Sequence, residues 1–237
     1  MRIDKYITSC GAATRSEVKK LIKAGRVTAD GICVKKADEQ IDENICTVML
    51  DGTVLHYRRF VYLMLNKPQG YISAVYDKHY PVVTDLISSE YAHFDVSPVG
   101  RLDLDTEGLL LLTNDGEFNH SMTSPKKNIY KRYFAVLDKP AEQSDIEVFK
   151  RGMEFKDFTT KPAVLEITDN PHEVYIEIAK GKFHQVKRMC ERAGKNVMFL
   201  KRVSIGPLML DASLSPGESR EQTDEELNIL KTVPQNG

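Results

Sequence analysis

Residues 100–113 place charged side chains directly before an apolar run, a pattern that could support chemistry. Four charged side chains occur in seven positions: Arg101, Asp103, Asp105 and Glu107. Asp103 and Asp105 could act as a carboxylate pair in glycoside hydrolysis or hold a divalent cation. No further carboxylate stands at an obvious partner position, and no His or Asp cluster with ligand spacing accompanies them, so we expect no metal. The spacing leaves a catalytic aspartate and a purely structural loop both open.

A second segment is strongly basic although the whole chain is not. The formal net charge is -1, which by itself argues against a nucleic-acid partner. Residues 1–59 nevertheless carry +3 and residues 181–210 carry +6, whereas residues 60–180 and 211–237 carry -6 and -4. We interpret the second basic block as the RNA-binding wall of a cleft, formed by Lys182, Lys187, Arg188, Arg192, Lys195, Lys201 and Arg202.

Two other residues have both a structural and a catalytic interpretation. His184 lies before an expected helix, where a lone histidine is more often a hydrogen-bond partner than a general base. The remaining histidines form no cluster in the sequence. Tyr133 lies in an expected strand, where an aromatic side chain is more often part of the core.

The first 59 residues have their own start and stop signals. Thr14 and Glu17 form a capping box, which predicts a helix that runs to about Ala24 and stops at Gly25. Residues 27–29 and 32–34 flank Asp30-Gly31 and predict a tight hairpin. One helical face carries basic residues that are either simply solvated or bind RNA phosphates. The predicted RNA-binding residues of this part are Lys5, Arg15, Lys19, Lys20, Lys23 and Arg26.

The rest of the chain alternates strands and helices without a parallel βαβ rhythm. Strands are expected at residues 60–65, 109–112, 130–137, 163–167, 174–178 and 197–203, and helices at 144–151, 184–192 and 224–230. Asn114-Asp115-Gly116 predicts a turn that closes the second strand. No GxGxxG or P-loop pattern is present, so we expect no nucleotide cofactor. The class is α+β with a large, mostly antiparallel sheet, and the expected domains are 1–59 and 60–231, followed by a tail at 232–237.

Composition limits the class of protein further. The chain has 237 residues, 41% of them hydrophobic and 28% charged, and it contains no run of about 18 apolar residues. The start Met-Arg-Ile-Asp-Lys lacks an apolar stretch, so we expect no signal peptide and no membrane partner. The four cysteines form no CxxC pair, which argues against a zinc ribbon and a disulfide framework. We therefore expect a cytoplasmic protein, with a monomer as the default.

The motifs together identify a family. From residue 1 to about 231 the chain resembles pseudouridine synthases of the RsuA type. The motifs that carry the resemblance are Leu65-Asn66-Lys67-Pro68-x-Gly70-Tyr71, Gly100-Arg101-Leu102-Asp103-x-Asp105-Thr106-x-Gly108-Leu109, Lys131-x-Tyr133 and Gly181-Lys182-Phe183-His184-Gln185-Val186-Lys187-Arg188-Met189.

The first 59 residues resemble the small α-L RNA-binding module, built from two helices and a hairpin. The matching residues are Arg2-x-Asp4-Lys5-Tyr6, Thr14-Arg15-Ser16-Glu17, Leu21-Ile22-x-x-Gly25-x-Val27 and Gly31. Ala29-Asp30-Gly31 departs from the usual apolar-Asn-Gly. Aspartate tolerates the same turn, so the expected fold is unchanged while one RNA-facing amide becomes an anion.

The resemblance implies a role for individual residues. Asp103 is implied as the catalytic aspartate, Tyr133 as the active-site tyrosine and Lys187 as the cation that faces Asp103. The implied substrate-binding residues are Lys67, Arg101, Thr106, Gly108, His184 and Arg188. The reaction breaks the N1–C1′ bond of uridine and rejoins the base through C5, so neither a redox cofactor nor an energy source is needed. An ionised Asp103 could attack C1′, attack C6 or stabilise an oxocarbenium ion on a flipped-out uridine.

The resemblance predicts site-specific isomerisation of uridine in ribosomal RNA, with rRNA or a ribosomal assembly intermediate as partner. Residues 157–163 and the end near Leu230 look more like the group that acts on small-subunit (16S) rRNA. A large-subunit (23S) rRNA enzyme of the same group is an alternative. A non-catalytic RNA-binding ribosome-assembly factor is another, against which the intact Asp103, Tyr133 and Lys187 argue.

Overall fold

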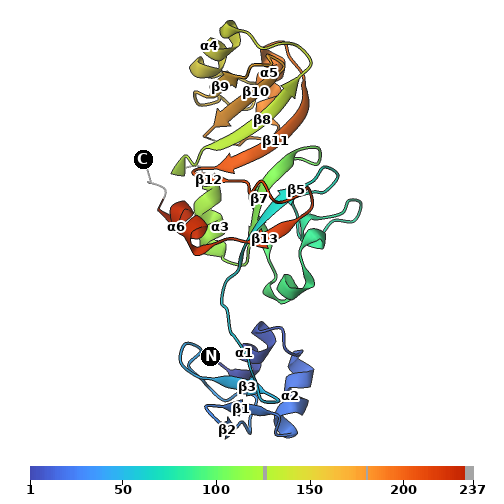
Figure 1. Ribbon diagram of the computed structural model, residues 1–237, viewed down its shortest axis with the longest axis vertical. Helices are drawn as coiled ribbons and strands as arrows, with labels where there is room; N and C mark the ends of the chain where they lie inside the picture. The colour runs from blue at the N-terminus through green and yellow to red at the C-terminus, as the bar shows by residue number, and fades with distance from the viewer. Residues whose placement is uncertain (125–126, 180, 233–237) are drawn as a thin grey trace. The chain divides into compact units, whose positions relative to one another are not determined.

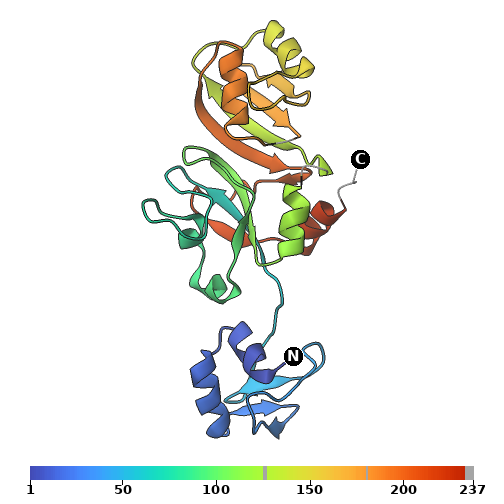
Figure 2. The ribbon, with the colours of Figure 1, turned by 180° about the vertical axis from the view of Figure 1, so that it is seen from behind.

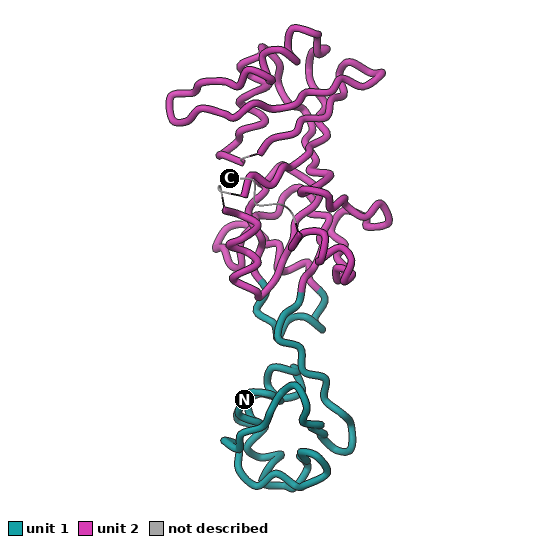
Figure 3. The backbone as a smooth tube through the Cα atoms, turned by 90° about the vertical axis from the view of Figure 1, so that its left-hand side faces the viewer, with its two compact units in different colours: residues 1–61, 88–96 teal, residues 62–87, 97–237 magenta. Residues whose placement is uncertain are grey.

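The computed structural model describes residues 1–124, 127–179 and 181–232, and the chain divides into two compact units. Unit 1 comprises Met1–Val61 together with Ser88–Val96, and unit 2 comprises Tyr62–Ile87 and the chain from Ser97 onward (Figure 3). No helix in the described ranges combines the length and the apolar character that a membrane span requires.

Unit 1 packs two helices against a small sheet. The helices are α1 (Ile3–Ser9) and α2 (Arg15–Lys23), and the sheet has the order β2-β1-β3-β4, with β1 (Val27–Ala29), β2 (Ile32–Cys33), β3 (Val48–Leu50) and β4 (Thr53–Val54). The apolar faces of both helices and the sheet share one buried cluster that includes Ile3, Ile7, Val18, Ile22 and Val27. A 3-10 helix, η2 (Ser89–Phe94), also belongs to this unit.

The expected local signals of unit 1 are confirmed. Thr14 and Glu17 form the capping box of α2. Asp30 and Gly31 both have positive φ angles, 49° and 78°, as a two-residue hairpin turn between β1 and β2 requires. The Asp30 carboxylate accepts a hydrogen bond from the Thr47 backbone N–H at 2.8 Å. The residue that departs from the usual turn therefore ties the hairpin to the next strand.

Unit 2 contains a nine-stranded sheet (Figure 1). Its main path has the order β13-β5-β7-β11-β8-β10-β9, with β6 paired to β7 and β12 to β11. The strands are β5 (Tyr62–Lys67), β6 (Ser97–Val99), β7 (Glu107–Thr113), β8 (Lys131–Leu137), β9 (Val164–Ile167), β10 (Glu173–Ile178), β11 (Val197–Ile205), β12 (Leu208–Met209) and β13 (Ser219–Glu221). The β7–β11 pair is parallel and the other pairs of this sheet are antiparallel, so the predicted α+β class is confirmed.

Helices cover the two halves of this sheet separately. Figures 1 and 2 show α4 (Gln143–Arg151) and α5 (Gln185–Arg192) beside the half that contains β8 to β10, and α3 (Gly116–Thr123) and α6 (Asp224–Lys231) beside the other half. A short 3-10 helix, η1 (Val83–Leu86), lies between β5 and β6 in sequence. The turn expected at residues 114–116 is wrong, because Asp115 accepts hydrogen bonds from the backbone N–H groups of Glu117 and Phe118 and so begins α3.

The two halves of the sheet join through a short parallel contact between β7 and β11. Only two residue pairs are in register there, Lys201 with Glu107 and Arg202 with Gly108. Gly108 has φ +100°, and a Cβ atom at this position would lie 2.2 Å from the Arg202 carbonyl oxygen. A glycine is therefore required where the two strands approach.

Candidate active site

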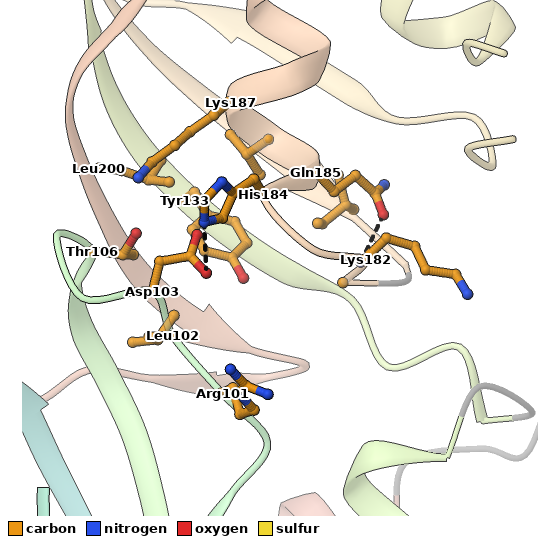
Figure 4. Close-up of a pocket in the computed structure, with 13 residues that line it drawn as sticks. Arg101, Leu102, Asp103, Thr106, Tyr133, Lys182, His184, Gln185, Lys187 and Leu200 are labelled. Carbon is orange, nitrogen blue, oxygen red and sulfur yellow. Dashed lines mark hydrogen bonds and ion pairs between the residues drawn. The ribbon is translucent and has the colours of Figure 1, made fainter. Parts of the chain in front are cut away.

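A small cavity of about 60 Å³ opens where the loop before β7, strand β8 and the start of α5 meet. Figure 4 shows the side chains of Asp103, Tyr133 and His184 gathered together in it. The sequence-predicted residues that line this cavity are Arg101, Asp103, Thr106, Tyr133, Lys182, His184 and Lys187. The fold thus brings together most of the residues that three separate motifs supplied.

Hydrogen bonds from Lys67, the last residue of β5, and from Ser73 hold the loop that carries Asp103. The Lys67 ammonium donates to the carbonyl oxygens of Asp103 and Thr106 at 3.0 and 2.9 Å, and also contacts those of Pro68 and Leu104. Ser73 exchanges two hydrogen bonds of 3.0 Å with the Leu102 backbone. The loop backbone is thereby fixed by side chains outside it.

Lys67 does not reach the cavity as a substrate-binding residue, so this prediction was wrong. Its side chain is fully buried and does not line the cavity. Burial lowers the pKa of Lys67 to about 8, and the carboxylates of Asp105 and Asp103 oppose this effect. The residue positions the catalytic loop through backbone carbonyl groups.

Asp103 faces His184 across the cavity. Asp103 Oδ1 lies 3.6 Å from His184 Nε2, and the two side chains are 29% and 40% exposed. His184 precedes α5 with φ 51°, an unusual backbone conformation for a residue with a Cβ atom, and its ring stacks on Phe183 at 3.8 Å between centroids. This backbone conformation directs the imidazole toward the carboxylate (Figure 4).

The expected pairing of Lys187 with Asp103 differs from the ion pair that forms. Lys187 Nζ lies 2.5 Å from Asp105 Oδ1, although Lys187 also lines the cavity. Burial tends to raise the pKa of Asp105, but the hydrogen bond and charge of Lys187 outweigh this and lower it below its usual value. Lys187 thus binds Asp105, the second carboxylate of the motif, and not Asp103.

Arg188, the next residue of α5, is occupied elsewhere. Its guanidinium forms two hydrogen bonds with the Asp157 carboxylate, at 2.9 and 2.5 Å. It also lies over the rings of Phe155 and Phe158, 4.7 and 4.6 Å from their centroids. Arg188 does not line the cavity, so its predicted role as a substrate-binding residue there is not supported.

Thr106 and Gly108 have different surroundings from those expected of two substrate-binding residues. Thr106 lines the cavity but is 1% exposed, and its hydroxyl oxygen has no hydrogen-bond partner among the described residues. Gly108 lies within β7 and makes the close approach to β11 described above. Its prediction as a substrate-binding residue is corrected to a structural one.

The remaining basic residues of the 181–210 block do not form one continuous wall. Lys195 forms a 2.7 Å ion pair with Asp145, and both side chains are largely buried. Arg202 is 4% exposed and donates from Nε to the Leu109 carbonyl oxygen at 2.8 Å. Lys182, Lys201 and Arg192 are at least partly exposed, and Figure 4 shows the Lys182 side chain extending away from Asp103.

In unit 1 the predicted RNA-binding residues keep their charges at the surface. Lys5, Arg15 and Lys19 line a hollow of about 550 Å³, and Lys20 and Lys23 are exposed on α2. Arg26 differs from this group.

The Arg26 guanidinium is bound by a neighbouring acid. Its Nε and Nη2 atoms donate to the two oxygens of Asp51 at 2.7 and 2.5 Å. The side chain is exposed, but its charge is compensated locally by Asp51.

Two residues that build the site were not predicted from the sequence. Ser73 clamps the Asp103 loop through Leu102, as described above. Gln185 is 4% exposed and accepts a hydrogen bond from the Lys182 backbone N–H at 3.0 Å, which fixes the turn into α5. Gln185 lies within a quoted motif, so its position was signalled, whereas Ser73 lies just beyond the first motif.

The arrangement suits chemistry on a small planar group by a carboxylate. Asp103 places its carboxyl group in a cavity that is also lined by Tyr133, which is 7% exposed. Within the described residues no three His, Cys, Asp or Glu side chains lie close enough to hold a metal ion. The groups that line the cavity include the Asp103 carboxylate, the His184 imidazole and the Tyr133 ring, together with the cationic side chains of Arg101 and Lys187.

Comparisons with known proteins agree with this geometry. Residues 61–192 match the family model described as RNA pseudouridylate synthase, and residues 1–44 match the S4 domain. The chain is 44% identical over 234 residues to "Uncharacterized RNA pseudouridine synthase YtzG" of Bacillus subtilis (strain 168), covering 97% of this chain and 98% of that protein. It is 40% identical over 234 residues to "Ribosomal small subunit pseudouridine synthase A" of Escherichia coli (strain K12), covering 96% and 98%.

A solved structure is similar over nearly the whole length. The structure described as "Crystal structure of pseudouridylate synthase" has a TM-score of 0.69 and 36% sequence identity, and covers 97% of this chain and 99% of that chain. Full-length relatives, both family models and the site geometry lead to one conclusion. The chain has an N-terminal S4 domain followed by a pseudouridine synthase domain and belongs to the RNA pseudouridine synthase family.

Proposed function

We propose that this protein isomerises a specific uridine of small-subunit ribosomal RNA to pseudouridine. The observation that carries the proposal is the cavity in which Asp103 meets Tyr133 and His184. The substrate is inferred from relatives named ribosomal small subunit pseudouridine synthase A in Escherichia coli and Salmonella typhimurium, at 40% and 38% identity.

Asp103 is the catalytic residue in this proposal. Attack at C1′, attack at C6 and stabilisation of an oxocarbenium ion all require its ionised carboxylate. The His184 imidazole lies beside it, with Nε2 at 3.6 Å from Asp103 Oδ1. Lys187 contributes a second positive charge to the cavity while it is held by Asp105.

Tyr133 supplies the surface on which the detached uracil is retained. Aromatic rings bind flipped bases by stacking, and extrusion of a nucleotide from its stack costs a few kcal/mol. The detached uracil must rotate until C5 faces C1′, and stacking on Tyr133 holds it in the cavity during that rotation. The hydroxyl group of Tyr133 is available to move the C5 proton in the last step.

The two units divide the work in this proposal. Residues 1–59 dock RNA phosphates through the exposed residues of α2, which gives affinity with little sequence information. Residues 60–231 perform the chemistry. Because the substrate is ribosomal RNA or a ribosomal assembly intermediate, we propose a monomer that acts in the cytoplasm.

Asp103→Asn tests the proposed catalytic residue. Asparagine keeps the size of the side chain but cannot act as an anionic nucleophile or charge stabiliser, so pseudouridine formation should fall to background while the unfolding midpoint is unchanged. Mapping of pseudouridine in both rRNAs, from cells that carry the wild type, the variant or no copy of the protein, measures the effect. One small-subunit position should disappear in the last two strains.

Asp105→Asn is the matched control two residues away. Asp105 does not line the cavity, so its substitution frees Lys187 but leaves the Asp103 carboxylate in place, and activity should fall by no more than about tenfold. Loss of activity in Asp105→Asn with retention in Asp103→Asn would reverse the assignment. A missing large-subunit position would contradict the proposed target.

A further inference from the structure

A second cavity adjoins the Asp103 cavity and is lined by cations. It has a volume of about 260 Å³ and shares Arg101, Tyr133 and Gly181 with the first cavity. Arg101, Lys131 and Arg202 contribute three positively charged groups to its wall. No Asp or Glu belongs to the described residues that line it.

The strand register brings these cations to one face of the sheet. Arg202 of β11 pairs with Tyr133 of β8, and Lys131 lies two residues before Tyr133 on the same strand. Directly paired residues, and residues two apart on one strand, present their side chains on the same face. The cavity therefore lies on the face that also carries Tyr133.

The two cations of the strands have hydrogen-bonding capacity to spare. The side chain of Arg202 is 4% exposed, and its buried Nη2 atom has no hydrogen-bond partner among the described residues. Lys131 Nζ donates to the Ile129 carbonyl oxygen at 2.6 Å, which uses one of its three protons. A buried donor without an acceptor costs about 1–3 kcal/mol, so an acceptor from outside is expected.

Electrostatics point to an anion. Burial and, as the smaller cause, the charge of Arg202 together lower the pKa of Lys131 to about 8. Two like charges near each other in a partly closed cavity are unfavourable unless an anion is bound between them. The oxygens of a phosphate group match the fixed fork of an arginine and the point charge of a lysine together.

We propose that this second cavity binds a phosphodiester group of the substrate RNA next to the target uridine, through Lys131, Arg202 and Arg101. The proposal rests on the proposed function, because the two cavities must hold one nucleotide and its neighbouring phosphate at the same time. Arg101 and Tyr133 line both the second cavity and the Asp103 cavity, so the two cavities lie next to each other as this arrangement requires.

Inorganic phosphate is the first probe, because its binding requires neither RNA nor turnover. It is titrated into the full-length protein at constant ionic strength, and the backbone amide signals of residues that line the second cavity are followed by NMR. Saturable binding is expected for the wild type, and Lys131→Met should weaken it about tenfold by removing a charged donor. The wild-type affinity should also fall as the pH rises above about 8, because Lys131 loses its charge.

Lys139→Met is the matched control. Lys139 also donates to a backbone carbonyl, that of Gly194, but it is exposed and does not line the second cavity. It should bind phosphate as the wild type does. Because burial penalises the charge of Lys131, Lys131→Met is expected to fold, and Lys131→Gln provides a second variant. Equal phosphate binding by the wild type and both Lys131 variants, or no saturable binding, would overturn the proposal.

The second probe separates RNA from free phosphate. Short oligoribonucleotides with one uridine are compared with the same oligonucleotides that carry a neutral methylphosphonate at one linkage beside it. A methylphosphonate at the linkage that the second cavity binds should lower the affinity of the wild type about tenfold relative to the unmodified oligonucleotide. Lys131→Met should bind the modified and the unmodified oligonucleotide equally and weakly.

Phosphate binding that depends on Lys131, together with RNA binding that does not, would identify a site for free phosphate and overturn the RNA assignment. For the RNA measurements, the wild type and each variant also carry Asp103→Asn, so the result does not depend on turnover. If rRNA mapping shows no pseudouridine dependent on this protein while both binding arms succeed, the proposed function fails and the phosphate site remains.

Discussion

The basic residues of the two units are used in different ways. In unit 1, Lys19, Lys20 and Lys23 project from α2 into solvent. In unit 2, most cations of the 181–210 block form ion pairs with acidic side chains or are buried. Lys187, Arg188 and Lys195 are paired with acids, and Arg202 is buried. An excess of positive charge in the sequence thus stays at the surface in one unit and is mostly paired or buried in the other.

The difference shows why charge counts alone do not locate an RNA surface. A helix exposed on one face keeps its basic residues in water, where they attract phosphates at long range. Residues on an interior strand, or on a helix packed over a sheet, meet the acids of neighbouring segments. Each pair costs side-chain entropy and desolvation, so the net stability gained is small, but the position of the loop or helix becomes defined.

The largest effect is expected for Lys67, the most deeply buried cation of unit 2. Lys67→Met removes the ammonium group that donates to the carbonyl oxygens of Asp103 and Thr106, which should lower the free energy of unfolding by about 3 kcal/mol. Urea denaturation at pH 7 measures this change. Lys139→Met makes the same substitution at an exposed position and should unfold like the wild type. If the two variants were equally stable, Lys67 would not be part of the loop's support.

A smaller effect, on binding instead of folding, is expected for the exposed face of α2. The combined substitutions Lys19→Ala, Lys20→Ala and Lys23→Ala should weaken rRNA binding by about tenfold. They should also make the slope of log K against the logarithm of the salt concentration less steep by about two to three. Alanine favours helix, so thermal unfolding should be unchanged. Binding isotherms at several salt concentrations measure the slope.

Arg26→Ala is the matched control for that face. Because Asp51 already compensates Arg26, this substitution should change the salt dependence less than any one of the three lysine substitutions. An equal or larger change would mean that Arg26 leaves Asp51 to bind RNA.

The smallest effect is expected for Arg188, which has an aromatic and acidic environment of its own. Arg188→Ala should leave rRNA affinity within about twofold of the wild type, because its charge is already held by Asp157. The melting temperature should fall slightly as the contacts with Phe155 and Phe158 are lost. A large loss of RNA affinity with an unchanged melting temperature would return Arg188 to the RNA surface.

Signals local in the chain were predicted well. The capping box of α2 and the Asp30-Gly31 turn depend on contacts within a few residues, and the strands of unit 2 were predicted from apolar or alternating runs of neighbouring residues. The helix α3 was missed because Asn114-Asp115-Gly116 is typical of both a turn and a helix start, and the hydrogen bonds of Asp115 decide between them.

The candidate site was predicted in its members but not in its pairings. Asp103, Tyr133 and His184 come from three motifs and do line one cavity. The partner of Lys187 could not be predicted, because Asp103 and Asp105 lie two residues apart and only the path of the loop decides which carboxylate reaches α5.

The sequence by itself determined the family, the order of an S4 domain and a pseudouridine synthase domain, and the residue types available for chemistry. These properties depend on motif order and on local periodicity, both of which can be read along the chain. The tertiary structure decided which charges remain available. The energy of a charged group depends on burial and on neighbours brought from distant positions, such as Asp157 for Arg188 and the sheet interior for Arg202. The net charge of -1 therefore conceals an exposed basic helix and, beside the candidate active site, a buried guanidinium whose Nη2 atom has no hydrogen-bond partner among the described residues.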